Sequence, residues 1–242
     1  KPGECWGLIP ARGGSRSVPL KNLANLGDRP LLDYCAAAGL AAERVSRTIC
    51  STDVGEIAKL CKTLGVEVHH RSTELSRDDT PVLDVIVHLL NDIATREGEV
   101  AEWIALLQPT SPFILPEHID QCVDALRSDS KAGSAQTVIP CPHNHHAFNQ
   151  RVVTDGRVSF RFPEERNTAY NKQKKPALAL FGNVVVFRTE YALEQNAVFA
   201  EPSLAVEVPP LFGFDCDGPI DFEVGKALLA ANLIGLPHLP RP

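Results

Sequence analysis

The sequence predicts an α/β fold: a doubly wound, mostly parallel sheet covered by helices, with an inserted β-hairpin or arm. Three observations support this prediction. Short apolar runs alternate with stretches of helical periodicity, one run (103–107) is apolar throughout, and Gly, Ser and Pro gather where the runs end. Strands that alternate with crossover helices are typical of a parallel sheet. With 242 residues, 44% of them hydrophobic, the chain is expected to form a single domain over 1–242.

The expected elements follow one another in a regular order. Apolar or alternating runs predict strands over about 6–10, 45–50, 66–69, 103–107, 135–139 and 183–188. Apolar residues at helical spacing predict helices over about 30–42, 55–64, 80–95, 116–126 and 220–233. The region 141–179 breaks this pattern because it is polar, with short alternating pieces and a basic run. We interpret it as the inserted arm rather than as a separate folded domain.

The composition argues against several classes of protein. The net charge of −6 disfavours binding of nucleic acid over a broad basic surface. No apolar run approaches the roughly 20 residues that span a bilayer. We therefore expect no signal peptide, no membrane or nucleic-acid partner, and a cytoplasmic location. The seven Cys are odd in number and contain no C-x-x-C pair, so buried free thiols are favoured over zinc or disulfides.

The first candidate site is the loop IPARGGSRSVPLKN over 9–22, which follows the first strand. Its glycines and serines let backbone N–H groups approach an anion closely. Three cations add charge suited to a polyphosphate: Arg12, Arg16 and Lys21. The loop matches neither the Walker A pattern nor the G-x-G-x-x-G dinucleotide fingerprint. It favours phosphate binding, with a flexible surface turn as the alternative.

A second candidate is the carboxylate pair Asp215 and Asp217. At positions i and i+2 of an expected strand the two side chains share one face, and together they suit Mg²⁺, which takes one or two carboxylates plus phosphate oxygens. The alternative is a solvated pair or a cap of the next helix, although Asp221 is better placed for that structural role.

A third candidate is the segment LLQPTSPF, where a buried strand runs into a loop pinned by two prolines and places Gln108 at the rim. A rigid turn that caps the next helix is the alternative. In a parallel sheet, ligands bind at the carboxyl ends of the strands. Four loops follow expected strands and should therefore meet at that edge: 11–22, 51–53, 71–79 and 108–113.

Five segments in order resemble the CMP-acyl-sugar synthetases, specifically the acylneuraminate cytidylyltransferase family: IPARGGSRSVPLKNL, ICSTD, HHRSTELSRDD, LLQPTSPF and FDCDGPIDFE. The resemblance covers about 6–230. It implies a Rossmann-like nucleotidyltransferase fold and an enzyme that transfers CMP from CTP to the anomeric hydroxyl of a nine-carbon 2-keto acid sugar, releasing pyrophosphate. It also implies Mg²⁺ as the cofactor and a homodimer in which the arm reaches into the partner's site.

The resemblance also implies roles for individual residues. The residues expected at the nucleotide are Ala11, Arg12, Gly13, Gly14, Ser15, Arg16, Asn22, Arg71 and Ser76. The residues expected at the acidic sugar are Gln108, Asn183 and His146. The metal ligands would be Asp215 and Asp217, which form the catalytic set together with Arg12 and Lys21.

The chain departs from the family's sialic-acid members mainly among the residues expected at the acidic sugar, which we call the sugar half of the site. No Lys follows the pair His145 and His146 closely, and Phe181-Gly182 stands where Arg-Pro often precedes the Asn matched by Asn183. The nucleotide half is well kept, except that Arg16 replaces the usual Lys. The alternatives left open are a different acidic acceptor, such as a legionaminic, pseudaminic or ketodeoxynonulosonic acid or a phosphonate, a glycosyltransferase, and a non-catalytic nucleotide-binding module.

Overall fold

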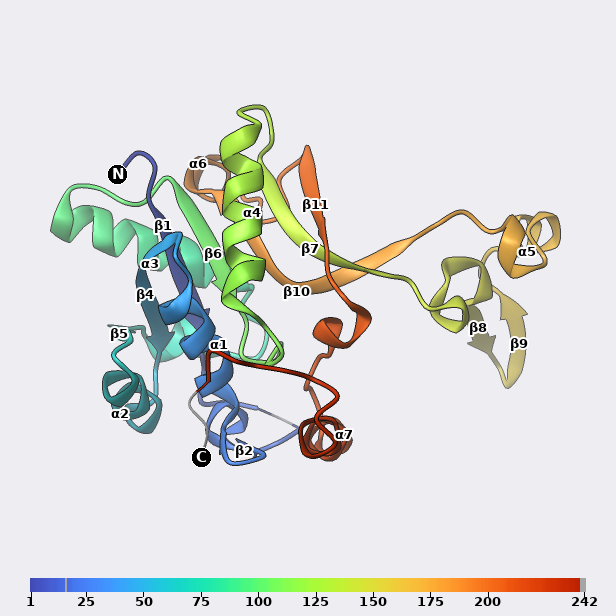
Figure 1. The fold of residues 1–242 in the computed structure, drawn as a ribbon, viewed down its shortest axis with the longest axis horizontal. Coiled ribbons are helices and arrows are strands. Elements are labelled where there is room, and N and C mark those ends of the chain that lie inside the picture. The colour runs from blue at the N-terminus through green and yellow to red at the C-terminus, as the bar shows by residue number, and fades with distance from the viewer. Residues whose placement is uncertain (16, 240–242) are drawn as a thin grey trace.

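The protein is built around one seven-stranded sheet, seen in a computed structural model that describes residues 1–15 and 17–239 (Figure 1). The strand order is β11-β7-β10-β6-β1-β4-β5. Strand β10 runs antiparallel to both of its neighbours, and all the other pairs are parallel. The predicted α/β class with a mostly parallel sheet is therefore confirmed.

The observed elements match most of the predicted ones within a few residues. The strands of the sheet are β1 (Cys5–Pro10), β4 (Val45–Thr52), β5 (Glu67–His70), β6 (Trp103–Leu107), β7 (Ser134–Pro140), β10 (Ala179–Arg188) and β11 (Ser203–Glu207). The helices are α1 (Leu31–Ala41), α2 (Gly55–Leu64), α3 (Val82–Glu97), α4 (Pro116–Ser128), α5 (Pro163–Thr168), α6 (Thr189–Glu194) and α7 (Pro219–Ala230). Two small hairpins complete the set: β2 (Asn25–Leu26) with β3 (Arg29–Pro30), and β8 (Arg151–Thr154) with β9 (Arg157–Phe160).

Helices cover both faces of the sheet. Apolar side chains of α1, α2 and α4 pack on one face, and those of α3 and α6 pack on the other. All five residues of β6 are buried between these layers, which explains why this run is apolar throughout. Among the described residues, no helix has the length and apolar character needed to cross a bilayer.

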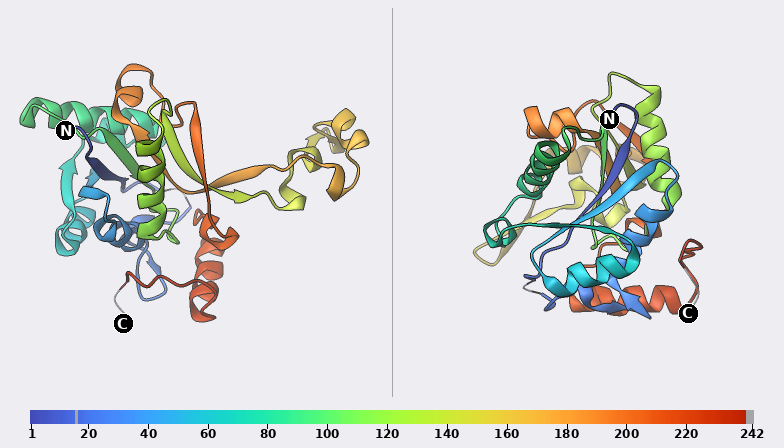
Figure 2. Two further views of the ribbon diagram at one scale, coloured as in Figure 1. Left: turned by 45° about the horizontal axis from the view of Figure 1, so that its top comes forward. Right: turned by 90° about the vertical axis from the view of Figure 1, so that its left-hand side faces the viewer.

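The region between β7 and β10 leaves the sheet as an extended arm, as predicted (Figures 1 and 2). The arm carries the β8–β9 hairpin and the short helix α5. Figure 1 and the left view of Figure 2 show it projecting away from the helices that cover the sheet. Strand β10 begins at the root of the arm and returns the chain to the centre of the sheet, between β6 and β7.

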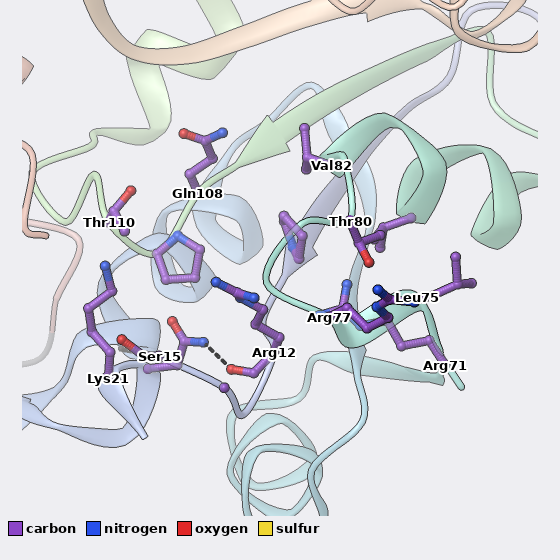
Figure 3. A pocket seen from close by; sticks show the side chains of 15 residues that line it. Arg12, Ser15, Lys21, Arg71, Leu75, Arg77, Thr80, Val82, Gln108 and Thr110 are labelled. Atoms are coloured by element: carbon purple, nitrogen blue, oxygen red, sulfur yellow. Dashed lines mark hydrogen bonds between the residues drawn. The ribbon is translucent and has the colours of Figure 1, made fainter. Parts of the chain in front are cut away.

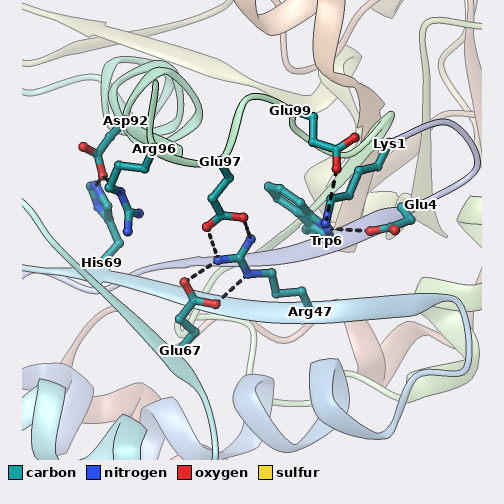
Figure 4. Close-up of polar contacts among 10 residues, drawn as sticks. All are labelled: Lys1, Glu4, Trp6, Arg47, Glu67, His69, Asp92, Arg96, Glu97 and Glu99. Carbon is teal, nitrogen blue, oxygen red and sulfur yellow. Dashed lines mark hydrogen bonds and ion pairs between the residues drawn. The ribbon is translucent and has the colours of Figure 1, made fainter. Parts of the chain in front are cut away.

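Arg47 on β4 joins the edge strand β5 and helix α3 to the body of the sheet (Figure 4). Its guanidinium donates to both carboxylate oxygens of Glu67, at 2.6 Å each, and to those of Glu97, at 2.8 and 2.9 Å. It also lies 4.8 Å from the centroid of the Trp6 ring. Hydrogen bonds to the two carboxylates hold the pKa of Arg47 above its usual value.

We expect Arg47→Ala to lower the free energy of unfolding by about 1–2 kcal/mol, because it removes two bidentate ion pairs and a cation–π contact. Urea denaturation measures this change. Arg44→Ala is the matched control, because Arg44 has an exposed ion pair with Asp124 and should cost less. Equal losses in the two variants would contradict the role given to Arg47.

Candidate active site

Loops that follow β1, β5 and β6 meet at the carboxyl edge of the sheet around an open pocket of about 290 Å³ (Figure 3). The predicted residues that line this pocket are Arg12, Gly14, Ser15, Lys21, Asn22, Arg71 and Gln108. An apolar wall from α3 and the loop after β5 was not predicted, and it consists of Leu75, Val82 and Val85. The pocket therefore offers cations on one side and an apolar surface on another, which suits a phosphorylated ligand with a planar base.

The loop after β1 is held by hydrogen bonds from several parts of the chain. The side-chain amide of Asn22 donates to the carbonyl of Arg12 at 2.9 Å, as Figure 3 shows. The backbone N–H of Gly13 donates to Asp53 Oδ1 at 3.1 Å. A Cβ atom at Gly13 would lie only 2.1 Å from Val54 Cγ2, so glycine is needed where this loop passes the end of β4. The loop is thus shaped before any ligand arrives.

Two of the four cationic residues that line the pocket, Arg12 and Arg71, differ in their partners. Arg12 Nη1 lies 2.6 Å from Asp78 Oδ1. Arg71 is buried, burial lowers its pKa, and its Nε has no hydrogen-bond partner among the described residues. A buried donor without a partner is costly, so the Arg71 side chain is suited to an anionic ligand.

The carboxylate pair lies beside the same loop but not on a strand, which corrects that part of the sequence-based interpretation. Asp215 and Asp217 lie in the segment between the 3₁₀ turn Pro210–Gly213 and α7. Lys21 Nζ is 3.0 Å from Asp217 Oδ1, and Asp217 is 70% exposed. A second hollow contains Asp217 and shares Arg12 and Lys21 with the first pocket. The carboxylates and the predicted phosphate-binding cations therefore lie side by side.

The two carboxylates differ in their surroundings. Burial and the nearby charge of Asp217 raise the pKa of Asp215 to about 6. The hydrogen bond from Lys21 lowers the pKa of Asp217. A divalent cation would relieve the repulsion between the two groups, so this oxygen donor set fits Mg²⁺. No group of three or more His, Cys, Asp and Glu in the described part of the chain could hold a metal, so the other ligands would come from substrate and water.

Backbone contacts fix the segment that carries this pair. The N–H of Cys216 donates to the carbonyl of Thr110 at 2.7 Å, which ties the segment to the loop after β6. Asp221 Oδ2 accepts from the N–H groups of Asp217 and Gly218, at 3.0 and 2.7 Å. The predicted structural role of Asp221 at the start of α7 is therefore confirmed.

Two of the three predicted sugar contacts do not line either hollow. The amide of Asn183 is buried and has only protein partners: Phe113 O, Phe212 O, His118 Nδ1 and Thr137 Oγ1, at 3.0–3.2 Å. His146 lies in the arm, where its ring nitrogens bond to Phe148 N and Pro176 O. Only Gln108 faces the pocket.

Two further predicted nucleotide contacts, Ala11 and Ser76, do not line the pocket. Ala11 is buried and donates its N–H to Ser51 O, so it holds the loop rather than facing the pocket. The hydroxyl of Ser76 donates to Ser72 O within the loop after β5. Its neighbours in the chain, Leu75 and Arg77, do line the pocket. The prediction for Arg16 falls outside the described residues.

The contacts that hold the loop after β1, and the apolar wall, were not identified by the sequence motifs. Asp53 and Asp78 hold Gly13 and Arg12, and their partners are 40 and 66 residues away in the chain. The apolar wall comes from ordinary core positions of α3, which helical periodicity alone cannot distinguish from other buried residues.

The cytidylyltransferase family model matches residues 6–199. N-acylneuraminate cytidylyltransferase B of Danio rerio is 29% identical over 90% of this chain and 50% of its own length. CMP-N,N'-diacetyllegionaminic acid synthase of Legionella pneumophila is 26% identical over 93% of this chain and 96% of its own length. The chain thus spans about half the length of the first of these relatives and nearly all of the second.

Solved structures show the same fold at low sequence identity. CMP:2-keto-3-deoxy-manno-octonic acid synthetase complexed with CTP gives a TM-score of 0.72 at 17% identity, over 95% of this chain and 99% of its own. 4-Diphosphocytidyl-2C-methyl-D-erythritol synthase gives 0.64 at 12% identity, over 93% and 98%. Since the family model covers most of the sequence, the chain belongs to the cytidylyltransferase family.

Proposed function

We propose that this chain transfers CMP from CTP to the anomeric hydroxyl of a nine-carbon, sialic-acid-like 2-keto acid sugar and releases pyrophosphate. The observation that carries this proposal is the meeting of three groups at one sheet edge: Arg12 and Arg71, the Asp215–Asp217 pair, and Gln108. The names of two curated relatives specify N-acylneuraminate and N,N'-diacetyllegionaminic acid, which supports the choice of acceptor.

In this reaction the acceptor oxygen bonds to the α-phosphorus of CTP. The bond from that phosphorus to the oxygen bridging to the β-phosphate breaks, so pyrophosphate leaves with the bonding electrons and the hydroxyl proton passes to solvent. Arg12 and Lys21 would bind the leaving pyrophosphate, and Arg71 would add a buried positive charge on the nucleotide side. Gln108, on the opposite side of the pocket, would orient the acceptor.

Mg²⁺ is part of the proposal, and Asp215 and Asp217 would hold it. When bound, the ion offsets the charge on phosphate oxygens. The raised pKa of Asp215 is consistent with this assignment, because it reflects burial of the carboxylate and, after that, the nearby charge of Asp217.

The direct test is pyrophosphate release from CTP and Mg²⁺ with a panel of acceptors: N-acetylneuraminic, ketodeoxynonulosonic, legionaminic and pseudaminic acids, and 2-aminoethylphosphonate. We expect turnover with at least one nine-carbon acid, and loss of turnover with EDTA or with ATP in place of CTP. Turnover with the phosphonate alone would assign a different acceptor class. CTP binding by calorimetry without any turnover would indicate a non-catalytic nucleotide-binding module.

Asp217→Asn should lower kcat by about 10²-fold or more, because it removes a charge from the proposed metal site. Since the side chain is largely exposed, and its ion pair with Lys21 is therefore screened by solvent, the thermal midpoint should change little. Asp79→Asn is the matched control, because it removes a carboxylate from the same hollow but not from the pair, and it should retain activity. Near-normal turnover of Asp217→Asn would exclude this residue from the mechanism.

The proposal includes a homodimer in which the arm contacts a second copy. Val153 and Val158 face each other across the β8–β9 hairpin and are 69% and 64% exposed. An isolated two-stranded hairpin is at best marginally stable in water, so this one is expected to pack on another surface. The arm holds seven Lys and Arg against three Asp and Glu over 141–179, whereas the whole chain has a net charge of −6. A second copy therefore offers the arm a body of opposite charge.

Replacing Val153 and Val158 together by Asp should weaken the dimer ~10²-fold or more, because it places two charges in an apolar contact. Light scattering over a range of concentrations measures the dissociation constant. Leu40→Asp is the control, since Leu40 is an exposed apolar residue on α1 and should leave the dimer unchanged. A monomeric wild-type chain, or a variant that remains dimeric, would contradict the proposed role of the hairpin.

A further inference from the structure

Three polar side chains in a row join the carboxyl ends of β4 and β5 to helix α3. Ser51 Oγ is 3.3 Å from His69 Nδ1, and His69 Nε2 is 3.3 Å from Asp92 Oδ2. Figure 4 shows His69 beside Asp92. Ser51 is 0% exposed and His69 is 5% exposed. The order resembles that of a hydrolase triad, but a fully buried hydroxyl does not meet a substrate, so these side chains have another role.

The ring of His69 is neutral, and its two nitrogens have different roles. Burial lowers the pKa of His69 below its ordinary value. Of the titratable and charged groups of α3 that face the ring, Asp92 raises this pKa, whereas His88 and Arg96 lower it. Because a carboxylate only accepts, the single ring proton belongs on Nε2, and Nδ1 accepts from the Ser51 hydroxyl. His69 therefore links β4 and α3 in one defined arrangement.

The carboxyl end of β4 supports two loops of the nucleotide pocket. Ser51 O accepts from the Ala11 N–H at 3.0 Å, which holds the loop after β1. Thr52 O accepts from the Arg71 N–H at 3.1 Å, which holds the first residue after β5. The side chain of Arg71 is buried and lines the pocket. A displacement of this end of β4 would therefore move both loops.

Strand β5, which precedes Arg71, has little backbone support of its own. It has four residues and lies at the edge of the sheet, where it pairs with β4. Ser51 and His69 are directly opposite each other in this pairing. The His69 side chain adds a link from this pair to Asp92 of α3, a helix that packs on the body of the sheet. The link thus fixes the end of β5 two residues before Arg71.

We infer that His69 is a positioning residue for nucleotide binding: it holds Arg71 where the guanidinium meets the nucleotide, and it does not touch the nucleotide itself. This inference rests on the proposed function, because CTP is the nucleotide that Arg71 would bind. The groups of a binding site need to be held within about 0.5 Å of their productive geometry. Loss of the His69 links would deprive the buried Ser51 hydroxyl of this acceptor and would release the end of β5.

The test measures the dissociation constant of CTP with Mg²⁺ by calorimetry, well below the thermal midpoint of each variant. His69→Leu should raise this constant about 10-fold, because leucine makes neither link. Ser51→Ala removes only the hydroxyl and should raise it about 3-fold or more. His70→Leu is the matched control, because it makes the same substitution at an exposed position one residue closer to Arg71. It should change the constant less than about 2-fold.

A double-mutant cycle shows whether His69 acts through Arg71. In the Arg71→Ala background, where the guanidinium is already absent, His69→Leu should change CTP binding less than about 3-fold. His69→Asn should bind CTP within about 3-fold of the wild-type chain, because its amide oxygen accepts from Ser51 in place of Nδ1. A merely structural role of His69 would produce neither the loss of additivity nor this rescue.

Four results would overturn the inference while leaving the proposed function intact. They are an unchanged dissociation constant in His69→Leu or Ser51→Ala, an equal increase in His70→Leu, additive effects of His69→Leu and Arg71→Ala, and no rescue by His69→Asn. If His69→Leu does not fold, Ser51→Ala decides the question by the same measurement. A wild-type chain that binds no CTP would instead overturn the proposed function and this inference together.

Discussion

The buried side-chain amide of Asn183 is the constraint that joins the central strand β10 to the segment carrying the carboxylate pair. It joins β10 to β7 through Thr137, to the start of α4 through His118, and to the segment before Asp215 through the Phe212 carbonyl. Burial lowers the pKa of His118 to about 4, so its ring is neutral and its Nδ1 can accept the hydrogen bond. A buried amide left without partners costs about 1–3 kcal/mol, so these elements must come together in one arrangement.

Two cations of the site form ion pairs with carboxylates of the chain itself. Arg12 is paired with Asp78, and Lys21 is paired with Asp217, so the loop after β1 is held between two carboxylates. A polyphosphate would compete for both cations, and a divalent ion would compete for Asp217. Binding therefore exchanges ion pairs within the protein for ion pairs with the ligand, in a loop whose backbone is already fixed.

The sequence predicted the nucleotide half of the site better than the acceptor half, and the reason is physical. The loop after β1 contains its own glycines and cations. One short segment of sequence is therefore enough to predict both its chemistry and its place at the end of a strand. Asn183 and His146 matched a family pattern, yet their hydrogen bonds come from residues that only the fold brings near. The short elements α6 and β11 were missed because six or fewer residues carry too little periodicity to identify.

The topology explains why the two halves differ in this way. The nucleotide loops follow strands that each run parallel to their neighbours, so their carboxyl ends meet at one edge. Asn183 lies instead on β10, which enters the sheet antiparallel, directly from the arm. Its partners come from β7, from the start of α4 and from the segment before Asp215, so its surroundings depend on contacts between distant parts of the chain. A sequence motif therefore identifies the loops at the strand ends more directly than it identifies the surroundings of a residue held by such contacts.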